Sequence, residues 1–323
     1  MIHSHMRPNG FLIALFLAVL IAGFFPLLLS EIPLGTFIDV GIAMIFFFYG
    51  LGLSVSELTA GLKNHKLHLL VQFSTFLFFP LLVLAFYPLA TQGGWLSYWK
   101  GFFFLAAVPS TVSSSVILVS LAKGNISAAI FNASLSGIIG VIITPLWLGL
   151  FMQTTDSPPL SEIFIKLILQ IVLPLLLGFL LRRFFSEWYN KYRNRLKLFD
   201  KTVIVLIVYA AFSASFASGL FADLSIWELA LIFVSVLFLF LFVHFGLGYI
   251  SQKLGFNYKD SIVARFCGSQ KSLVHGSAMA KVIFGSSAAM GVFLLPLMLY
   301  HFIQLMLISW FVEKMNNPSK KHS

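Results

Sequence analysis

Long apolar runs separated by short polar or charged turns occupy nearly the whole of this chain of 323 residues. A bilayer core of about 30 Å is crossed by about 20 apolar residues in helical conformation. Ten runs of suitable length occur, at approximately 10–30, 36–56, 67–90, 97–123, 126–152, 160–181, 202–222, 226–250, 260–283 and 286–312. The segments between most runs are too short for an extramembrane domain. The pattern predicts an all-α polytopic membrane protein with ten transmembrane helices.

The composition agrees with a bilayer environment. Hydrophobic residues make up 59% of the chain and charged residues only 10%, whereas soluble chains are about a quarter charged. A water-soluble globular protein is therefore excluded. The single cysteine, Cys267, excludes an internal disulfide framework and a cysteine-ligated structural metal. The first run is too long for a cleavable signal peptide, and no small-residue cleavage pattern follows it.

The basic residues fall unequally on the two sides of the membrane. If the segments between runs are assigned alternately to the two sides of the membrane, starting with the segment of Arg7, 16 of the 21 basic residues fall on the same side. The other side receives Lys100, Lys166 and Lys281, while Arg265 and Lys271 fall within the ninth run. Since cytoplasmic loops carry the excess of Lys and Arg, we expect an integral plasma (inner) membrane protein with both termini in the cytoplasm. The net charge of +10 thus reflects membrane topology and indicates no nucleic-acid partner.

The chain divides into two halves of five runs each, at 10–152 and 160–315. An odd number of helices per half means that the second half is inserted upside down relative to the first. This arithmetic predicts two inverted five-helix repeats. The densest basic block, from Arg182 to Lys201, is expected as a loop between the sixth and seventh helices.

The fourth run of each half is interrupted by residues that disturb a helix. In the first half Pro109 precedes a serine and threonine stretch, and in the second Gly268 begins a polar stretch that ends at Ser272. Interrupted spans persist only where they are buried in protein or line a water-filled cavity, so the matched pair predicts crossing broken helices and a midplane binding site. Their N-termini would offer N–H donors to an anion and their C-termini carbonyl oxygens to a cation. Alternatively, Pro109 is only a kink and the serines bond neighbouring carbonyls.

Lys271 lies in the middle of the ninth run, about eleven residues from its nearer end. A membrane-embedded lysine costs at least ~2.5 kcal/mol on insertion scales, so it is a functional candidate by default. The structural alternative is a lysine bonded to the carbonyls at a helix C-terminus, which would staple the crossover. No acidic residue lies within the body of either broken span, and Asp260 stands only at the entrance of the ninth.

The candidate residues for substrate or ion binding are the polar and glycine positions of the two interruptions. They are Ser110, Thr111, Ser113, Ser114, Ser115, Gly268, Ser269, Gln270, Lys271 and Ser272. Polar residues on other spans that are candidates for lining the cavity are Gln72, Thr75, Asn132, Ser134 and His275. For any single one of these five, an interhelical hydrogen bond or a packing role is the simpler interpretation.

The interrupted runs resemble those of the bile acid:sodium symporter family. The end of the fourth run, Leu121-Ala122-Lys123-Gly124-Asn125, is similar to that family's Leu-Ala-Lys-Gly-Asp signature, and Gly268-Ser269-Gln270-Lys271-Ser272 is similar to its Gly-Met-Gln-Asn-Ser core. The Gly-Ser-Gln-Lys pattern and Phe78-Phe79-Pro80 resemble the branch containing the seventh member of solute carrier family 10 and its bacterial homologues. The resemblance implies a panel domain of spans 1, 2, 6 and 7 and a core domain of spans 3–5 and 8–10.

Several residues depart from the pattern of the sodium-coupled members. Phe266 stands where those members place an acidic residue, and Thr75 stands at their third-span glutamine. Lys271 replaces their asparagine, while Gln270 and Ser272 are retained. No metal site is expected, except that the resemblance implies Ser115 and Gln270 as ligands if sodium binds. A hard cation needs several oxygen ligands, and here a carboxylate is missing while an ammonium has been gained. The hypothesis is that Lys271 takes the electrostatic place of sodium, either permanently or by carrying a proton.

The function expected from the resemblance is secondary active transport of a small or amphipathic organic anion by alternating access, with no prosthetic cofactor. The alternatives are a proton-coupled or uncoupled carrier using Lys271, and a regulatory membrane protein without transport. A retinal-type photoreceptor would require seven spans and an intramembrane carboxylate. A membrane-embedded enzyme is disfavoured because no Gly-x-Ser-x-Gly, His-Glu-x-x-His or paired membrane aspartates occur.

Overall fold

The computed structural model describes residues 10–26, 28–29, 31–53, 64–152, 159–222, 224–285, 287 and 289–316. Within these residues the chain forms helices and turns and no strand. Six helical stretches are long and apolar enough to cross a membrane by length and composition. They are Leu34–Gly52, His65–Leu84, Ile126–Phe151, Ser161–Ala217, Ile226–Lys253 and Met290–Asn316, with Gly10–Phe24 as a shorter apolar helix. The predicted all-helical membrane class is confirmed.

The chain groups into two compact units. The first comprises the described residues of Met1–Gly52, Ile165–Ser225 and Ser277–Leu294. The second comprises those of Leu53–Phe164, Ile226–Gly276 and Leu295–Ser323. Each unit is therefore assembled from segments that are distant in the sequence.

In the first unit, α1 (Gly10–Phe24) and α2 (Leu34–Gly52) pack on α11 (Leu173–Ala217). Glycines set the spacing of α2 and α11. A Cβ added at Gly178 would lie 2.0 Å from the carbonyl oxygen of Phe47, and one added at Gly50 would lie 2.1 Å from the carbonyl oxygen of Leu175. The two backbones are thus in direct contact, and neither position accepts a side chain without a shift of the helices.

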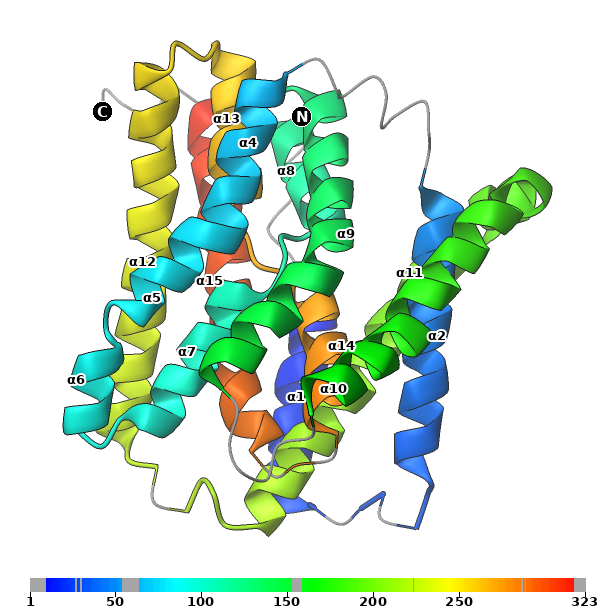
Figure 1. Cartoon of the computed structure of the whole chain (residues 1–323), viewed down its shortest axis with the longest axis vertical. Helices are drawn as coiled ribbons and strands as arrows, with labels where there is room; N and C mark the ends of the chain where they lie inside the picture. The colour runs from blue at the N-terminus through cyan, green and yellow to red at the C-terminus, as the bar shows by residue number, and fades with distance from the viewer. Residues whose placement is uncertain are drawn as a thin grey trace. The chain divides into compact units, whose positions relative to one another are not determined.

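The basic block Arg182 to Lys201 is helical, so the prediction of a loop there is wrong. From Phe179 to Ala217 the sequence contains neither glycine nor proline, and the residues of the block include good helix formers such as Arg, Lys, Leu and Glu. The helix turns back within this stretch, because Leu175 and Val203 both lie against α2. Figure 1 shows the ribbon of α11 reaching a tip and returning. The α10 helix (Leu160–Leu167) and a π-helical turn, η2 (Ile168–Val172), precede it.

The second unit contains the interrupted segments. Its helices are α4 (His65–Phe73), η1 (Ser74–Phe78), α5 (Phe79–Leu84), α6 (Tyr87–Gln92), α7 (Leu96–Ala107), α8 (Ser113–Leu121), α9 (Ile126–Phe151), α12 (Ile226–Lys253), α13 (Tyr258–Ser269), the start of α14 (Leu273–Phe284) and most of α15 (Met290–Asn316). The fourth run is divided into α7 and α8, and the ninth into α13 and α14, as Figure 1 shows.

Both interruptions begin with a residue in extended conformation. Val108 has φ −73° and ψ 154°, the conformation that a following proline imposes on the residue before it. Gln270 has φ −88° and ψ 148°. The third run forms one continuous helical stretch, His65–Leu84, which includes the π-helical turn η1 and ends earlier than the expected residue 90.

Candidate functional site

The two interrupted segments contact each other inside the second unit. The backbone N–H of Ser272 donates a 2.8 Å hydrogen bond to the carbonyl of Pro109. The hydroxyl of Ser110 donates to the carbonyl of Cys267 at 2.7 Å. Each interrupted segment therefore supplies hydrogen-bond partners to the other. These bonds offset the cost of burying unpaired backbone groups in an apolar environment.

The side chain of Lys271 ends at three backbone carbonyls. Its Nζ donates to Thr75 at 2.7 Å, Ala106 at 2.6 Å and Val108 at 2.9 Å. The side chain is fully buried, and Nζ lies 4.3 Å from the centre of the Phe79 ring. An ammonium group has three N–H donors, so each proton has one oxygen. Ala106 and Val108 end α7, where the helix dipole favours a cation.

The carbonyl of Thr75 is available because of Pro80. In η1 the N–H of Phe79 donates to the carbonyl of Ser74. With the same five-residue spacing, the carbonyl of Thr75 would accept from the N–H of residue 80. Residue 80 is Pro80, which has no N–H. The proline in the third run therefore leaves a carbonyl oxygen without an intrahelical partner, and Lys271 supplies the missing donor.

The backbone of Lys271 is held from α15, mainly by Gln304, with Nδ1 of His301 also 3.5 Å from the Lys271 carbonyl oxygen. Gln304 accepts from the Lys271 N–H at 2.8 Å and donates to its carbonyl at 2.8 Å. The Tyr300 hydroxyl donates to the carbonyl of Ser269, and Ser74 donates to the carbonyl of Gly268 at 3.0 Å. The breaks are thereby fixed by neighbouring helices.

Several of these supporting residues were not predicted as site residues. They are Ser74, Phe79 and Tyr300, together with Thr144, whose hydroxyl donates to the carbonyl of Ala107 at 2.8 Å. These residue types are common in membrane helices. In the sequence, only the expected depth of a residue in the bilayer could mark it as part of the site. Pro80 is a local sequence signal that the carbonyl of Thr75 lacks an intrahelical partner, because a proline cannot donate a backbone hydrogen bond.

The side-chain amide of Gln270 lies among the hydroxyl groups that begin α8. Its Oε1 accepts from Ser115 at 2.8 Å and from Thr111 at 2.5 Å, with Ser114 at 3.3 Å. Its Nε2 is buried and has no hydrogen-bond partner among the described residues. Unpaired N–H groups beside the N-terminus of a helix suit an anionic group. Of the predicted residues here, only the side chain of Ser113 lies outside the described part of the structure.

The remaining residues of the ninth-run break have structural contacts. Ser272 caps α14, because its hydroxyl accepts from the N–H of His275 at 3.2 Å. Ser269 bonds back to the carbonyl of Arg265 at 2.6 Å and lies 3.3 Å from Nδ1 of His244. A Cβ at Gly268 would lie 2.8 Å from the Leu247 side chain. These contacts fix the position of the break against α12 and α14.

A separate polar cluster joins α4 and α9. Gln72 donates to the carbonyl of Asn132 at 3.1 Å, and Asn132 lies 2.9 Å from Nδ1 of His68. These contacts match the interhelical hydrogen bonds considered as the simpler interpretation. Ser134 is buried on the same helix.

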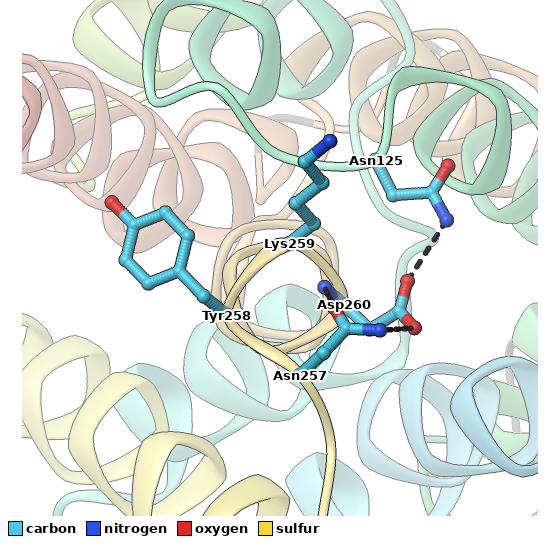
Figure 2. A pocket seen from close by; sticks show the side chains of 5 residues that line it. All are labelled: Asn125, Asn257, Tyr258, Lys259 and Asp260. Atoms are coloured by element: carbon cyan, nitrogen blue, oxygen red, sulfur yellow. Dashed lines mark hydrogen bonds between the residues drawn. The ribbon is translucent and has the colours of Figure 1, made fainter.

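A third cluster surrounds Asp260, as Figure 2 shows. The side-chain amides of Asn64, Asn125 and Asn257 donate to its carboxylate at 2.8, 2.8 and 2.9 Å. Each asparagine also caps a helix, because its side-chain oxygen accepts from an N–H in the first turn of α4, α9 or α13. One carboxylate thus ties together the N-termini of three helices. The pocket beside it has a volume of about 400 Å³ and is lined by Asn125, Asn257, Tyr258, Lys259 and Asp260.

The Leu-Ala-Lys-Gly-Asn stretch forms the turn that brings Asn125 to this cluster. Lys123 has φ +57°, in the left-handed region. A Cβ at Gly124 would lie 2.8 Å from the Val119 side chain and 2.9 Å from that of Ile262. The stretch therefore has a structural role at the joint of α8, α9 and α13.

Long apolar helices, two interrupted spans in mutual contact and a buried ammonium at their junction are typical of membrane transporters. The chain belongs to the SBF-like CPA transporter family, whose sequence pattern matches residues 9–317. This confirms the resemblance to bile acid:sodium symporters.

Curated relatives cover nearly the same length. An uncharacterized protein of Pseudomonas aeruginosa, PA2026, is 36% identical over 309 residues, covering 95% of this chain and 92% of the relative. The putative symporter YfeH of Escherichia coli is 35% identical, covering 92% and 90%. Sodium/bile acid cotransporter 7 of Xenopus tropicalis is 32% identical, covering 94% and 90%. The chain is therefore an integral membrane protein of a transporter family.

Proposed function

We propose that this protein is a carrier of a small or amphipathic organic anion that works by alternating access, and that the ammonium of Lys271 takes the place of a coupling sodium ion, so that transport is not coupled to sodium. The observation that carries the proposal is the set of three carbonyl oxygens, from Thr75, Ala106 and Val108, around Nζ. Backbone carbonyls are hard oxygen ligands of the kind that bind alkali and alkaline-earth cations. A covalently attached cation in this position removes the need for a dissolved one.

The geometry favours a permanent charge over a proton carrier. A neutral amine has only two protons, so it would leave one of the three carbonyls without a donor. The buried carbonyl oxygens then lose a charge-assisted bond, which is worth about 1.5–3 kcal/mol. A proton-coupled carrier remains the second candidate, and a pH gradient across liposomes distinguishes the two.

The anion would bind at the donors beside the interruption. Gln270 offers an unpartnered Nε2, and the nearby hydroxyls of Thr111, Ser114 and Ser115 surround its oxygen. The three hydroxyls donate to the Gln270 oxygen and hold the amide in place, so Nε2 is the free donor for the anion, while Lys271 supplies positive potential from the same break. The proposed substrate site accordingly comprises Ser110, Thr111, Ser113, Ser114, Ser115 and Gly268 to Ser272, with the Gln72 and Asn132 cluster in a supporting role.

The architecture proposed is ten helices in two inverted repeats, at 10–152 and 160–315, with spans 1, 2, 6 and 7 as a panel domain and spans 3–5 and 8–10 as a core domain. The grouping of α1, α2 and α11 in one compact unit supports this division, whereas Ser277–Leu294, from the ninth and tenth spans, groups with that unit and not with the other core spans. Alternating access would then come from rocking of one domain against the other. The excess of basic residues on one side supports a plasma (inner) membrane location with cytoplasmic termini.

The test is anion transport in liposomes, with ligand-induced thermal stabilisation as a second readout, in sodium and in choline buffer. Equal activity in both buffers is expected, and a steep sodium requirement would overturn the role of Lys271. Lys271→Ala should abolish transport, whereas Lys253→Ala, which changes an exposed lysine of α12, should not. Absence of flux for every anion tried, with ligand binding intact, would favour a regulatory membrane protein.

A further inference from the structure

The helical stretch from Arg182 to Lys201, here called the α11 tip, carries a large positive charge. It contains seven basic side chains and two acidic ones, Glu187 and Asp200. The basic residues are Arg182, Arg183, Lys191, Arg193, Arg195, Lys197 and Lys201. Acidic residues within the tip are too few to neutralise its charge.

Large apolar side chains are exposed between these cations. Phe184 is 66% exposed and Leu198 65%, with Phe185 and Trp188 at 44% and 43%. Exposing phenylalanine and leucine to water would not stabilise a charged helix. Helices that lie in the headgroup region of a bilayer combine basic residues with Trp, Phe and Leu, and aromatic side chains concentrate at that depth.

The cations are displayed as a group. Arg193, Lys197 and Lys201 follow one another at intervals of four, which places them on one helix face. Like charges at this spacing repel each other, so a bound anion relieves a cost that the free helix bears. The guanidinium of Arg183 lies over the ring of Phe184 at 4.5 Å, so charge and aromatic surface are presented together.

The tip is attached firmly to the end of α2. Phe48 contacts Trp188 and Phe199, with ring centres 6.3 and 5.8 Å apart. A Cβ at Gly52 would lie 2.6 Å from the Tyr189 hydroxyl. This packing fixes the tip at one end of a membrane-spanning helix, where lipid headgroups lie.

We propose that the α11 tip binds the phosphodiester headgroups of anionic phospholipids in the leaflet that surrounds it. The warrant is charge complementarity combined with exposed apolar side chains, since clusters of four to eight basic residues beside a membrane span attract anionic lipid. Arginine adds bidentate recognition of phosphate oxygens. The interaction is separate from the substrate site, which lies in the other compact unit.

The test uses the full-length protein in phosphatidylcholine nanodiscs with increasing fractions of phosphatidylglycerol. Thermal stability and the number of lipids retained in native mass spectrometry are measured. The variant Arg193→Gln/Lys197→Gln/Lys201→Gln should lose the stabilisation by phosphatidylglycerol. Each neutralised side chain should weaken the interaction about fivefold, because one basic residue near an anionic surface contributes about 1 kcal/mol.

The matched control is Lys66→Gln/Lys253→Gln/Lys314→Gln, which removes three exposed charges elsewhere on the same predicted side. It should retain the response to phosphatidylglycerol, as should Arg193→Lys/Lys197→Arg/Lys201→Arg. The proposal is overturned if the tip variant still binds phosphatidylglycerol as the unaltered protein does, or if the control loses as much. Equal stabilisation by phosphatidylcholine or by inorganic phosphate would also overturn it. Circular dichroism verifies that each variant is folded.

Discussion

The side-chain amide of Asn125 donates a 2.8 Å hydrogen bond to the carboxylate of Asp260, across 135 positions of the sequence. The aspartate of the family signature falls at this asparagine. In this chain an amide is required there, because two carboxylates at hydrogen-bond distance repel each other unless they share a proton or a cation.

Asn125→Asp should therefore destabilise the protein in a pH-dependent way. The adjacent negative charge raises the pKa of the introduced carboxyl group above its unfolded value, so stability approaches that of the unaltered protein at acidic pH. It falls as the pH rises through this raised pKa, by about 2–3 kcal/mol at neutral pH. Thermal unfolding in detergent from pH 4 to pH 8 measures this.

The control is Asn125→Ser, which keeps a helix cap and adds no charge. Its loss of stability should be nearly constant over the same pH range. A pH profile for Asn125→Asp that runs parallel to that of the serine variant contradicts the prediction.

Lys271→Asn should create a response to sodium. Removing the ammonium leaves the carbonyl oxygens of Thr75, Ala106 and Val108 without their donor, and each buried carbonyl left unsatisfied costs about 1–3 kcal/mol. Sodium can then occupy part of this oxygen set, so it should raise the melting temperature of the variant and leave that of the unaltered protein unchanged. Equal melting temperatures of the variant in sodium and in choline would show that the oxygens do not form a cation site.

Gln304→Ala should strongly destabilise the second unit. Its two hydrogen bonds satisfy both backbone groups of Lys271, and each buried group left unsatisfied costs about 1–3 kcal/mol. We expect a total loss of about 2–5 kcal/mol in chemical unfolding monitored by intrinsic fluorescence. Gln252→Ala, at an exposed position of α12, is the matched change and should alter stability by less than about 0.5 kcal/mol. A comparable loss in both variants would refute a special role for Gln304.

Gly178→Ala should separate α2 from α11. The new Cβ would lie 2.0 Å from the carbonyl oxygen of Phe47, so the helices must move apart at a cost of about 2–4 kcal/mol. Gly246→Ala on α12 adds a methyl group with nothing within 4 Å, and should be neutral or stabilising by up to about 1 kcal/mol. Similar melting temperatures for the two variants would contradict the close packing.

Much of the helical pattern could be predicted because long apolar runs and prolines act locally. The interruptions at Pro109 and at Gly268 to Ser272 were placed correctly by residues that disturb a helix on their own. The helical α11 tip does not follow from the pattern of apolar runs, because charged residues end an apolar run but do not end a helix. The partners of Lys271 depend on the contact of the C-terminal end of α7 with the ninth-run break, and no local pattern encodes such a contact.

The position of the ammonium has a consequence for the energetics of a transport cycle. A cation bound to the chain by covalent bonds returns with the protein on every turnover, so it delivers no charge and takes no energy from an ion gradient. Under the proposed function, an anion carried alone transfers its own negative charge. A membrane potential that is negative inside then favours export by about 2.3 kcal/mol for each unit charge and each 100 mV.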